Sequence, residues 1–153
     1  MTAPSDPIVA AWQAALAAEH AAIYGYGELG PVLDAPLQPL ARTDQQLHRG
    51  LRDASATTIA GFGVTPVASR AAYPAPFPLT DPAAGMRLAV ELEDRCAAAW
   101  RYVIAAGVLN PLDRRAATAR KTGQARLTAS AIRALQWRSR VTPSDPTVAF
   151  PGL

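Results

Sequence analysis

Prolines and glycines divide this chain into four long stretches that contain no proline beyond the first turn, and this division constrains the fold most. The first stretch ends at Gly30-Pro31 and the second at Gly61-Phe62-Gly63. Asp6-Pro7 and Asp81-Pro82 are typical of helix starts, because aspartate caps free N–H groups and proline fits the first helical position. The pattern predicts four helices and an extended tail, over residues 6–29, 38–60, 81–107, 111–140 and 141–153.

The lengths of the links between these helices predict the topology. The first and last links are short, and short links favour antiparallel neighbours. The proline-rich middle link has about 18 residues and can extend to about 60 Å, whereas a helix of about 24 residues is about 36 Å long. We therefore predict an all-α, ferritin-like four-helix bundle with a long crossover between the second and third helices. A simple up-down-up-down bundle with a slack loop is the alternative.

The length and composition indicate one domain over residues 1–153 in the cytoplasm. The single cysteine, Cys96, excludes an intrachain disulfide, and a reducing compartment is the default for such a chain. The first residues lack the features of a signal peptide, and no apolar run approaches the ~20 residues of a membrane helix. Because 14 of the 15 basic residues are arginine, we expect a GC-rich, actinobacterial source.

Charge is concentrated in the last predicted helix. Residues 110–140 hold eight basic residues against one acid, Asp113. The interpretation that we favour is a solvated face that complements the rest of the bundle. The alternative is an anion or nucleic-acid surface, formed by a stripe of Arg115, Arg126, Arg133 and Arg140.

Acidic side chains fall on the predicted core faces of three helices. On helical wheels, Glu19 and Glu93 lie on the apolar faces of the first and third helices. In the second helix the predicted apolar face contains Asp44, with His48 and Ser55 at its edge; its apolar members are Leu40, Leu47, Leu51, Ala54 and Thr58. Buried carboxylates must protonate, pair or bind metal. Either a metal is held by Glu19, Asp44, His48 and Glu93, or Arg120, tyrosine hydroxyls and His48 satisfy the acids.

Four motifs in order carry a resemblance to a known family. They are Glu19 to Gly27 (EHAAIYGYG), His48-Arg49, Tyr73 to Pro78 (YPAPFP) and Leu92-Glu93. Together they resemble the actinobacterial ferritin-like family described as a domain of unknown function, DUF4439, over about residues 10–140. The resemblance implies a ferritin-like bundle in the cytoplasm with no established activity.

The ligand pattern of ferritin-like di-iron proteins is only partly present. Those proteins use one Glu from each of two helices and a Glu-x-x-His pair from each of the other two. Glu19 and Glu93 match the single glutamates. In the second helix the four residues that end at His48 begin with Gln45 instead of glutamate, and in the last helix residues 124–127 contain neither the glutamate nor the histidine. We therefore predict a metal-free core with a structural or binding role and Arg120 as counter-charge. The alternative is an iron- or manganese-binding oxidase or metal-handling protein that uses Glu19, Asp44, His48 and Glu93.

Predictions about partners rest on the tail and on the bundle itself. Bundles of this kind often associate, so a homodimer is one expectation, with no membrane contact and no nucleic acid. The tail from Val148 to Leu153 is apolar, so we predict that it folds back on the bundle or on a partner subunit. Cys96 and the three tryptophans are predicted to be core residues without a chemical role.

Overall fold

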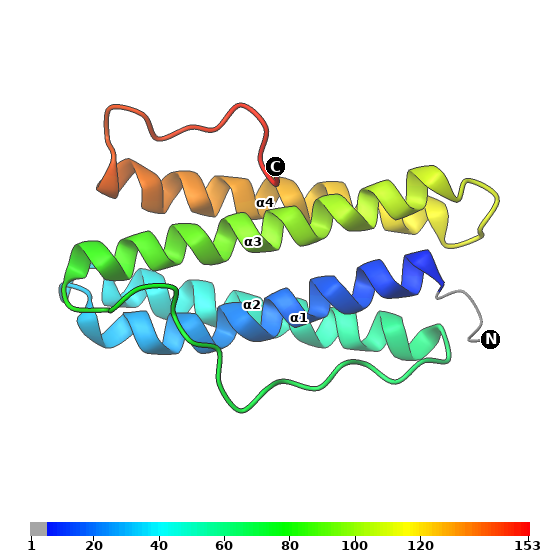
Figure 1. The fold of residues 1–153 in the computed structure, drawn as a ribbon, viewed down its shortest axis with the longest axis horizontal. Coiled ribbons are helices and arrows are strands. Elements are labelled where there is room, and N and C mark those ends of the chain that lie inside the picture. Colours follow the sequence, from blue (N-terminus) through cyan, green and yellow to red (C-terminus); the bar gives the residue numbers. More distant parts are fainter. Residues whose placement is uncertain (1–5) are drawn as a thin grey trace.

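Four long helices form an antiparallel bundle in the computed structural model, which describes residues 6–153. The described residues contain no strand, and the predicted four-helix bundle is confirmed (Figure 1). A short 3-10 turn, η1 (Gly30–Val32), follows the first helix. The helices are α1 (Pro7–Leu29), α2 (Gln38–Gly61), α3 (Pro82–Leu109) and α4 (Ala116–Val141).

The crossover between α2 and α3 runs the length of the bundle, as predicted. The link leaves one end of the bundle, passes along the outside of α1 and enters α3 at the opposite end (Figure 1). Gln13 of α1 holds it with two bonds, since its Nε2 donates to the Thr65 carbonyl at 2.7 Å and its Oε1 accepts from the Val67 N–H at 2.7 Å. Farther along α1, His20 Nε2 lies 3.1 Å from the Val67 carbonyl oxygen. The crossover is therefore fixed to α1.

Aspartate caps begin α1 and α3 where the sequence predicted them. Asp6 Oδ1 accepts from the N–H groups of Ile8 and Val9 at 3.0 and 3.1 Å. Asp81 Oδ1 accepts from the Ala84 N–H at 2.8 Å. Each cap is followed by proline at the first helical position, where a backbone N–H would have no partner within the helix and proline has none to satisfy.

The fourth helix begins five residues later than predicted, at Ala116 instead of residue 111. Asn110 Nδ2 closes α3 by donating to the Ala106 carbonyl at 2.8 Å. Asp113 then forms a turn, because its Oδ1 accepts from the Arg115 N–H at 2.7 Å and its carbonyl accepts from the Ala116 N–H at 2.9 Å. A short acidic side chain that binds nearby N–H groups competes with helix formation, and here it delays the start of the helix.

The tail folds back on the bundle, as predicted (Figure 1). Arg138 Nη1 donates to the Pro146 carbonyl and Arg101 Nη1 to the Gly152 carbonyl, each at 3.4 Å. Gly152, at φ +84°, lies so close to α3 that a Cβ there would sit 2.8 Å from the Ala97 carbonyl oxygen. The side chain of Phe150 nevertheless stays 71% exposed, so the backbone makes the closest contacts of the tail.

The buried face of α2 differs from the predicted one. Leu47, predicted to be buried, is 42% exposed, whereas His48 and Ser55, predicted at the edge, are fully buried. The buried face is instead formed by Ala41, Asp44, His48, Ser55 and Ile59. The prediction was wrong because it aligned the face on leucines, while the polar residues find partners inside the bundle. Ser55, for example, donates to the Leu51 carbonyl at 2.8 Å.

The contact between α3 and α4 depends on glycine at position 123. A Cβ at Gly123 would lie 2.7 Å from Ile104 Cγ1 and 3.1 Å from the Trp100 carbonyl oxygen, and the backbone atom cannot move aside. We expect Gly123→Ala to destabilise the bundle by roughly 1–3 kcal/mol in urea unfolding, despite the better helix propensity of alanine. Gly50→Ala is the control, since no atom lies within 4 Å of the position that a Cβ would take there, and it should gain about 1 kcal/mol. Equal stabilities of the two variants would contradict the close packing.

Candidate functional site

The four predicted side chains from α1, α2 and α3 meet in the middle of the bundle. Glu19, His48 and Glu93 are fully buried, and Asp44 is 4% exposed. Burying ionisable groups is costly unless each finds hydrogen bonds or an opposite charge. The arrangement of donors around these acids therefore decides what the site can do.

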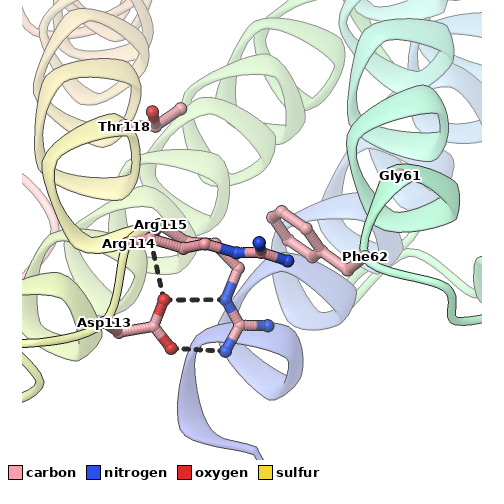
Figure 2. A pocket seen from close by; sticks show the side chains of 6 residues that line it. All are labelled: Gly61, Phe62, Asp113, Arg114, Arg115 and Thr118. Carbon is pink, nitrogen blue, oxygen red and sulfur yellow. Dashed lines mark hydrogen bonds and ion pairs between the residues drawn. The ribbon is translucent and has the colours of Figure 1, made fainter.

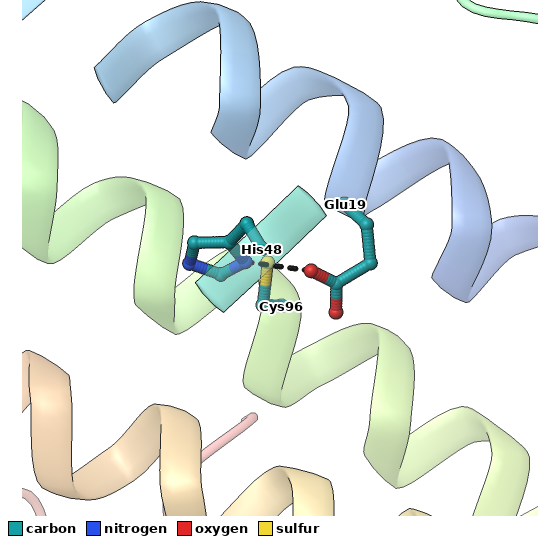
Figure 3. Close-up of side chains that lie close together, drawn as sticks. All are labelled: Glu19, His48 and Cys96. Atoms are coloured by element: carbon teal, nitrogen blue, oxygen red, sulfur yellow. Dashed lines mark hydrogen bonds and ion pairs between the residues drawn. The ribbon is translucent and has the colours of Figure 1, made fainter. Parts of the chain in front are cut away.

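His48 lies between two glutamates. Its Nδ1 is 2.6 Å from Glu19 Oε2 and its Nε2 is 2.9 Å from Glu93 Oε1; Figure 3 shows the bond to Glu19. A ring with a carboxylate on each nitrogen is held as the imidazolium, which donates from both positions. Burial by itself would lower the pKa of His48, but the hydrogen bonds and charges of the two glutamates outweigh it and raise the pKa to about 9.

Glu93 receives donors from three helices on a single oxygen. Its Oε1 accepts from the Tyr26 hydroxyl at 2.8 Å and from Arg133 Nε at 3.0 Å, in addition to His48. Burial raises the pKa of Glu93, but the hydrogen bonds and charges of His48 and Arg133 outweigh burial and leave that pKa below its usual value. Glu93 therefore stays ionised. Its second oxygen, Oε2, has no hydrogen-bond partner among residues 6–153.

Two tryptophans donate to the other two acids. Trp100 Nε1 donates to Glu19 Oε1 at 3.0 Å, and Trp137 Nε1 donates to Asp44 Oδ2 at 2.9 Å. Burial is the main cause that raises the pKa of Asp44. The helical spacing of these indoles predicted core packing only. Their N–H groups are part of the site.

The arginine that compensates the acids is Arg133, so the prediction of Arg120 was wrong. Arg133 is 6% exposed and also donates from Nη2 to Ser130 Oγ at 3.1 Å. Arg120 points to the end of the bundle and donates to the Gly107 carbonyl at 2.9 Å. The buried polar residues of α4 are thus Ser130 and Arg133, whereas the sequence pattern predicts the ligand positions at residues 124–127.

The predicted arginine stripe on α4 is not a free basic surface. Arg133 is in the core, and the Cζ of Arg126 lies 5.5 Å from the centroid of the Trp100 ring. Arg115 forms ion pairs with Asp113 and Asp6, and Figure 2 shows its paired bonds to Asp113 beside Phe62. The stripe therefore does not present four available charges to an anion.

A metal would meet a different donor set from the predicted one. Ligand atoms of Glu19, His48 and Cys96 lie within 4.8 Å of one another (Figure 3). A metal needs a thiolate and an unprotonated ring nitrogen. Burial and nearby acids raise the pKa of the Cys96 thiol well above its usual value, and both nitrogens of His48 already contact carboxylates. Metal binding would have to displace protons and existing hydrogen bonds at each ligand.

The fold and the site define a class: a four-helix bundle with a long crossover and a buried cluster of acids balanced by histidine and arginine. The chain belongs to the family described as a domain of unknown function, DUF4439, which matches residues 11–153. It is similar to a solved structure, the crystal structure of a conserved hypothetical protein, rv2844, from Mycobacterium tuberculosis. That likeness has 32% sequence identity and a TM-score of 0.79 and covers 91% of this chain and 99% of the other.

Comparison with curated proteins gave no match. Among the described residues, no helix has both the length and the apolar character needed to cross a membrane.

Proposed function

We propose that the chain is a ferritin-like bundle whose core is a metal-free polar network, and that it acts as a structural or binding module in the cytoplasm. The observation that carries the proposal is the engagement of both His48 ring nitrogens by carboxylates, at 2.6 and 2.9 Å. A histidine in this state has no lone pair for a metal. The free, buried thiol of Cys96 suits a reducing compartment.

Charge balance supports a core without metal. Three carboxylates, Glu19, Asp44 and Glu93, face two buried cations, His48 and Arg133. Arg126 adds a third, half-buried cation that interacts with the charge of Glu19. A divalent ion placed beside an imidazolium and a guanidinium would be repelled strongly in this environment of low dielectric.

The identity of the α4 residues supports the same proposal. Ferritin-like di-iron proteins place a Glu-x-x-His pair on a helix at such a position. Here Ser130 and Arg133 have that spacing; Arg133 bonds to Glu93, and Ser130 bonds to Arg133. A guanidinium in place of a ligand supplies permanent positive charge without a metal.

Metal content tests the proposal directly. After expression in medium supplemented with iron and manganese, elemental analysis should find metal far below one ion per chain, and Glu19→Ala should not change that content. Added metal should also leave the melting temperature unchanged, because only a ligand that binds the native state stabilises it. A Ser130→Glu/Arg133→His variant, which rebuilds the absent ligand pair, is the matched positive control. Full occupancy of the unaltered protein would refute the proposal.

A second candidate function is metal binding by Glu19, Asp44, His48 and Glu93, as in an oxidase or a metal-handling protein. Two observations favour it: Glu93 Oε2 has no hydrogen-bond partner in the described part of the chain, and Glu19, His48 and Cys96 approach one another closely. This candidate predicts stoichiometric iron or manganese that is lost in Glu19→Ala. The same elemental analysis therefore separates the two functions.

A further inference from the structure

A second site lies on the outer side of the α1–α3 contact, away from the polar network. It is a pocket of about 260 Å³ covered by the crossover. Residues of α1 at helical spacing, Ala21, Tyr24, Gly25 and Glu28, form one wall. Leu88, Leu92 and Arg95 of α3 form the second wall, and crossover residues 70 and 72–76 form the third. Three of the stretches that carry the family resemblance, those that contain Tyr24, Tyr73 and Leu92, thus meet here.

Glycine at position 25 makes room for the floor of this pocket. A Cβ at Gly25 would lie 2.6 Å from Leu92 Cδ1, so the missing side chain lets Leu92 rest directly on α1. Leu92 is 5% exposed, so a buried apolar side chain forms the floor. None of the residues that line the pocket is one of the acids or the histidine of the polar network, so the pocket is a site of its own.

The crossover wall of the pocket is held in place by hydrogen bonds. The Arg70 N–H donates to the Tyr73 hydroxyl at 2.8 Å, which closes a small turn. The Tyr73 ring lies 5.7 Å from the Tyr24 ring, centroid to centroid, at a tilt of 57°. Upstream, the two bonds from Gln13 fix the crossover to α1. Because this wall is already ordered in the absence of a ligand, binding does not lose conformational entropy by ordering it.

The charged residues of the pocket include one arginine that is available to an anion. Arg70, Arg95 and Glu28 are among the residues that line the pocket. Arg95 is paired with Glu91 at 2.9 Å. The side chain of Arg70, by contrast, makes no hydrogen bond or ion pair within the described part of the chain, and neither does that of Glu28 on the α1 wall. An arginine without a partner at the edge of an aromatic pocket is suited to a carboxylate, which it binds with two parallel bonds.

We propose that this pocket binds a small carboxylic acid with an aromatic or aliphatic body. The Arg70 guanidinium holds the carboxylate, and the body of the ligand lies against the rings of Tyr24 and Tyr73 above Leu92. A volume of about 260 Å³ limits the ligand to a small molecule. This inference is independent of the metal content of the core and supplies a ligand class for the binding role.

Titration with two matched probes tests the proposal. Phenylacetate and phenethylamine share an aromatic body and differ in charge, so calorimetric titration of the full chain should detect saturable binding of phenylacetate only. Arg70→Gln should weaken that binding at least about tenfold, the loss expected for a charge-assisted hydrogen bond. Arg49→Gln is the control, because Arg49 lies on α2, outside the pocket, and is exposed. Both substitutions are on the surface, so the variants should fold like the unaltered protein.

Three results would overturn the proposal. The first is no saturation by phenylacetate at millimolar concentration, and the second is equal binding of phenethylamine. The third is equal loss of affinity in Arg70→Gln and Arg49→Gln. None of these results changes the metal content of the core, so failure here is distinct from failure of the proposed function.

Discussion

Replacing Arg133 with methionine should destabilise the bundle by about 3–5 kcal/mol, the cost of removing one partner from a buried ion pair. Methionine fills much of the space of the arginine stem but leaves Glu93 with one fewer cation in a fully buried position. Ser130 would also lose its contact with the guanidinium. Urea unfolding at neutral pH, followed by circular dichroism, measures the loss as a lower midpoint.

Two further variants show whether this loss comes from the buried charge. Arg138→Met removes the arginine that pairs with Asp94, which is 41% exposed, so it should cost less than about 1 kcal/mol. Arg133→Met/Glu93→Gln removes both charges of the buried pair and should recover part of the stability. If Arg133→Met costs no more than Arg138→Met, then Arg133 does not compensate Glu93.

The helices and their order could be predicted because the signals are local. Asp6-Pro7 and Asp81-Pro82 fix the starts of two helices through bonds to adjacent N–H groups. The length of the proline-rich link fixes the crossover. The start of α4 could not be predicted from Asn110-Pro111, since the Asp113 turn competes with the helix there.

That local error carried over into the predicted site. A helix assumed to start at residue 111 has its middle near residues 124–127, whereas the helix from Ala116 to Val141 has its middle farther along. The prediction of ligands on α4 therefore missed Ser130 and Arg133. A signal was available, because Ser130, Arg133 and Trp137 recur at helical spacing among small buried residues.

The donors of the network depend on contacts between different helices, which one sequence does not reveal. Glu19 and its donor Trp100 are 81 residues apart in the chain, and Asp44 and Trp137 are 93 apart. A tryptophan on an apolar face predicts packing alone, because its N–H has no local partner that would indicate a polar role. The acids could be predicted because a charged residue on an apolar helix face is recognisable in the sequence wherever the helix begins.

The stability of the protein should fall as pH rises from about 6.5 to about 9, owing to His48. An unfolded histidine has a pKa of about 6.5, and the glutamates on both sides raise the folded value to about 9. A raised pKa means that the folded state binds the proton more tightly, so the contribution is complete below pH 6.5 and is lost as pH rises through 9. The loss amounts to about 3 kcal/mol, at 1.36 kcal/mol per unit of pKa shift.

The other histidine of the chain provides the control for this prediction. The chain contains two histidines, and His20 bonds to the Val67 carbonyl on the surface. Urea midpoints measured between pH 6 and 8 should decline for the unaltered protein and for His20→Gln but stay nearly level for His48→Gln. Above pH 8 the buried thiol and tyrosine add to the decline in every variant, because burial keeps the pKa values of Cys96 and Tyr26 well above their usual ranges and the unfolded chain loses these protons first. A level profile for the unaltered protein would mean that His48 is neutral in the fold, and the lone pair that metal binding requires would then be available.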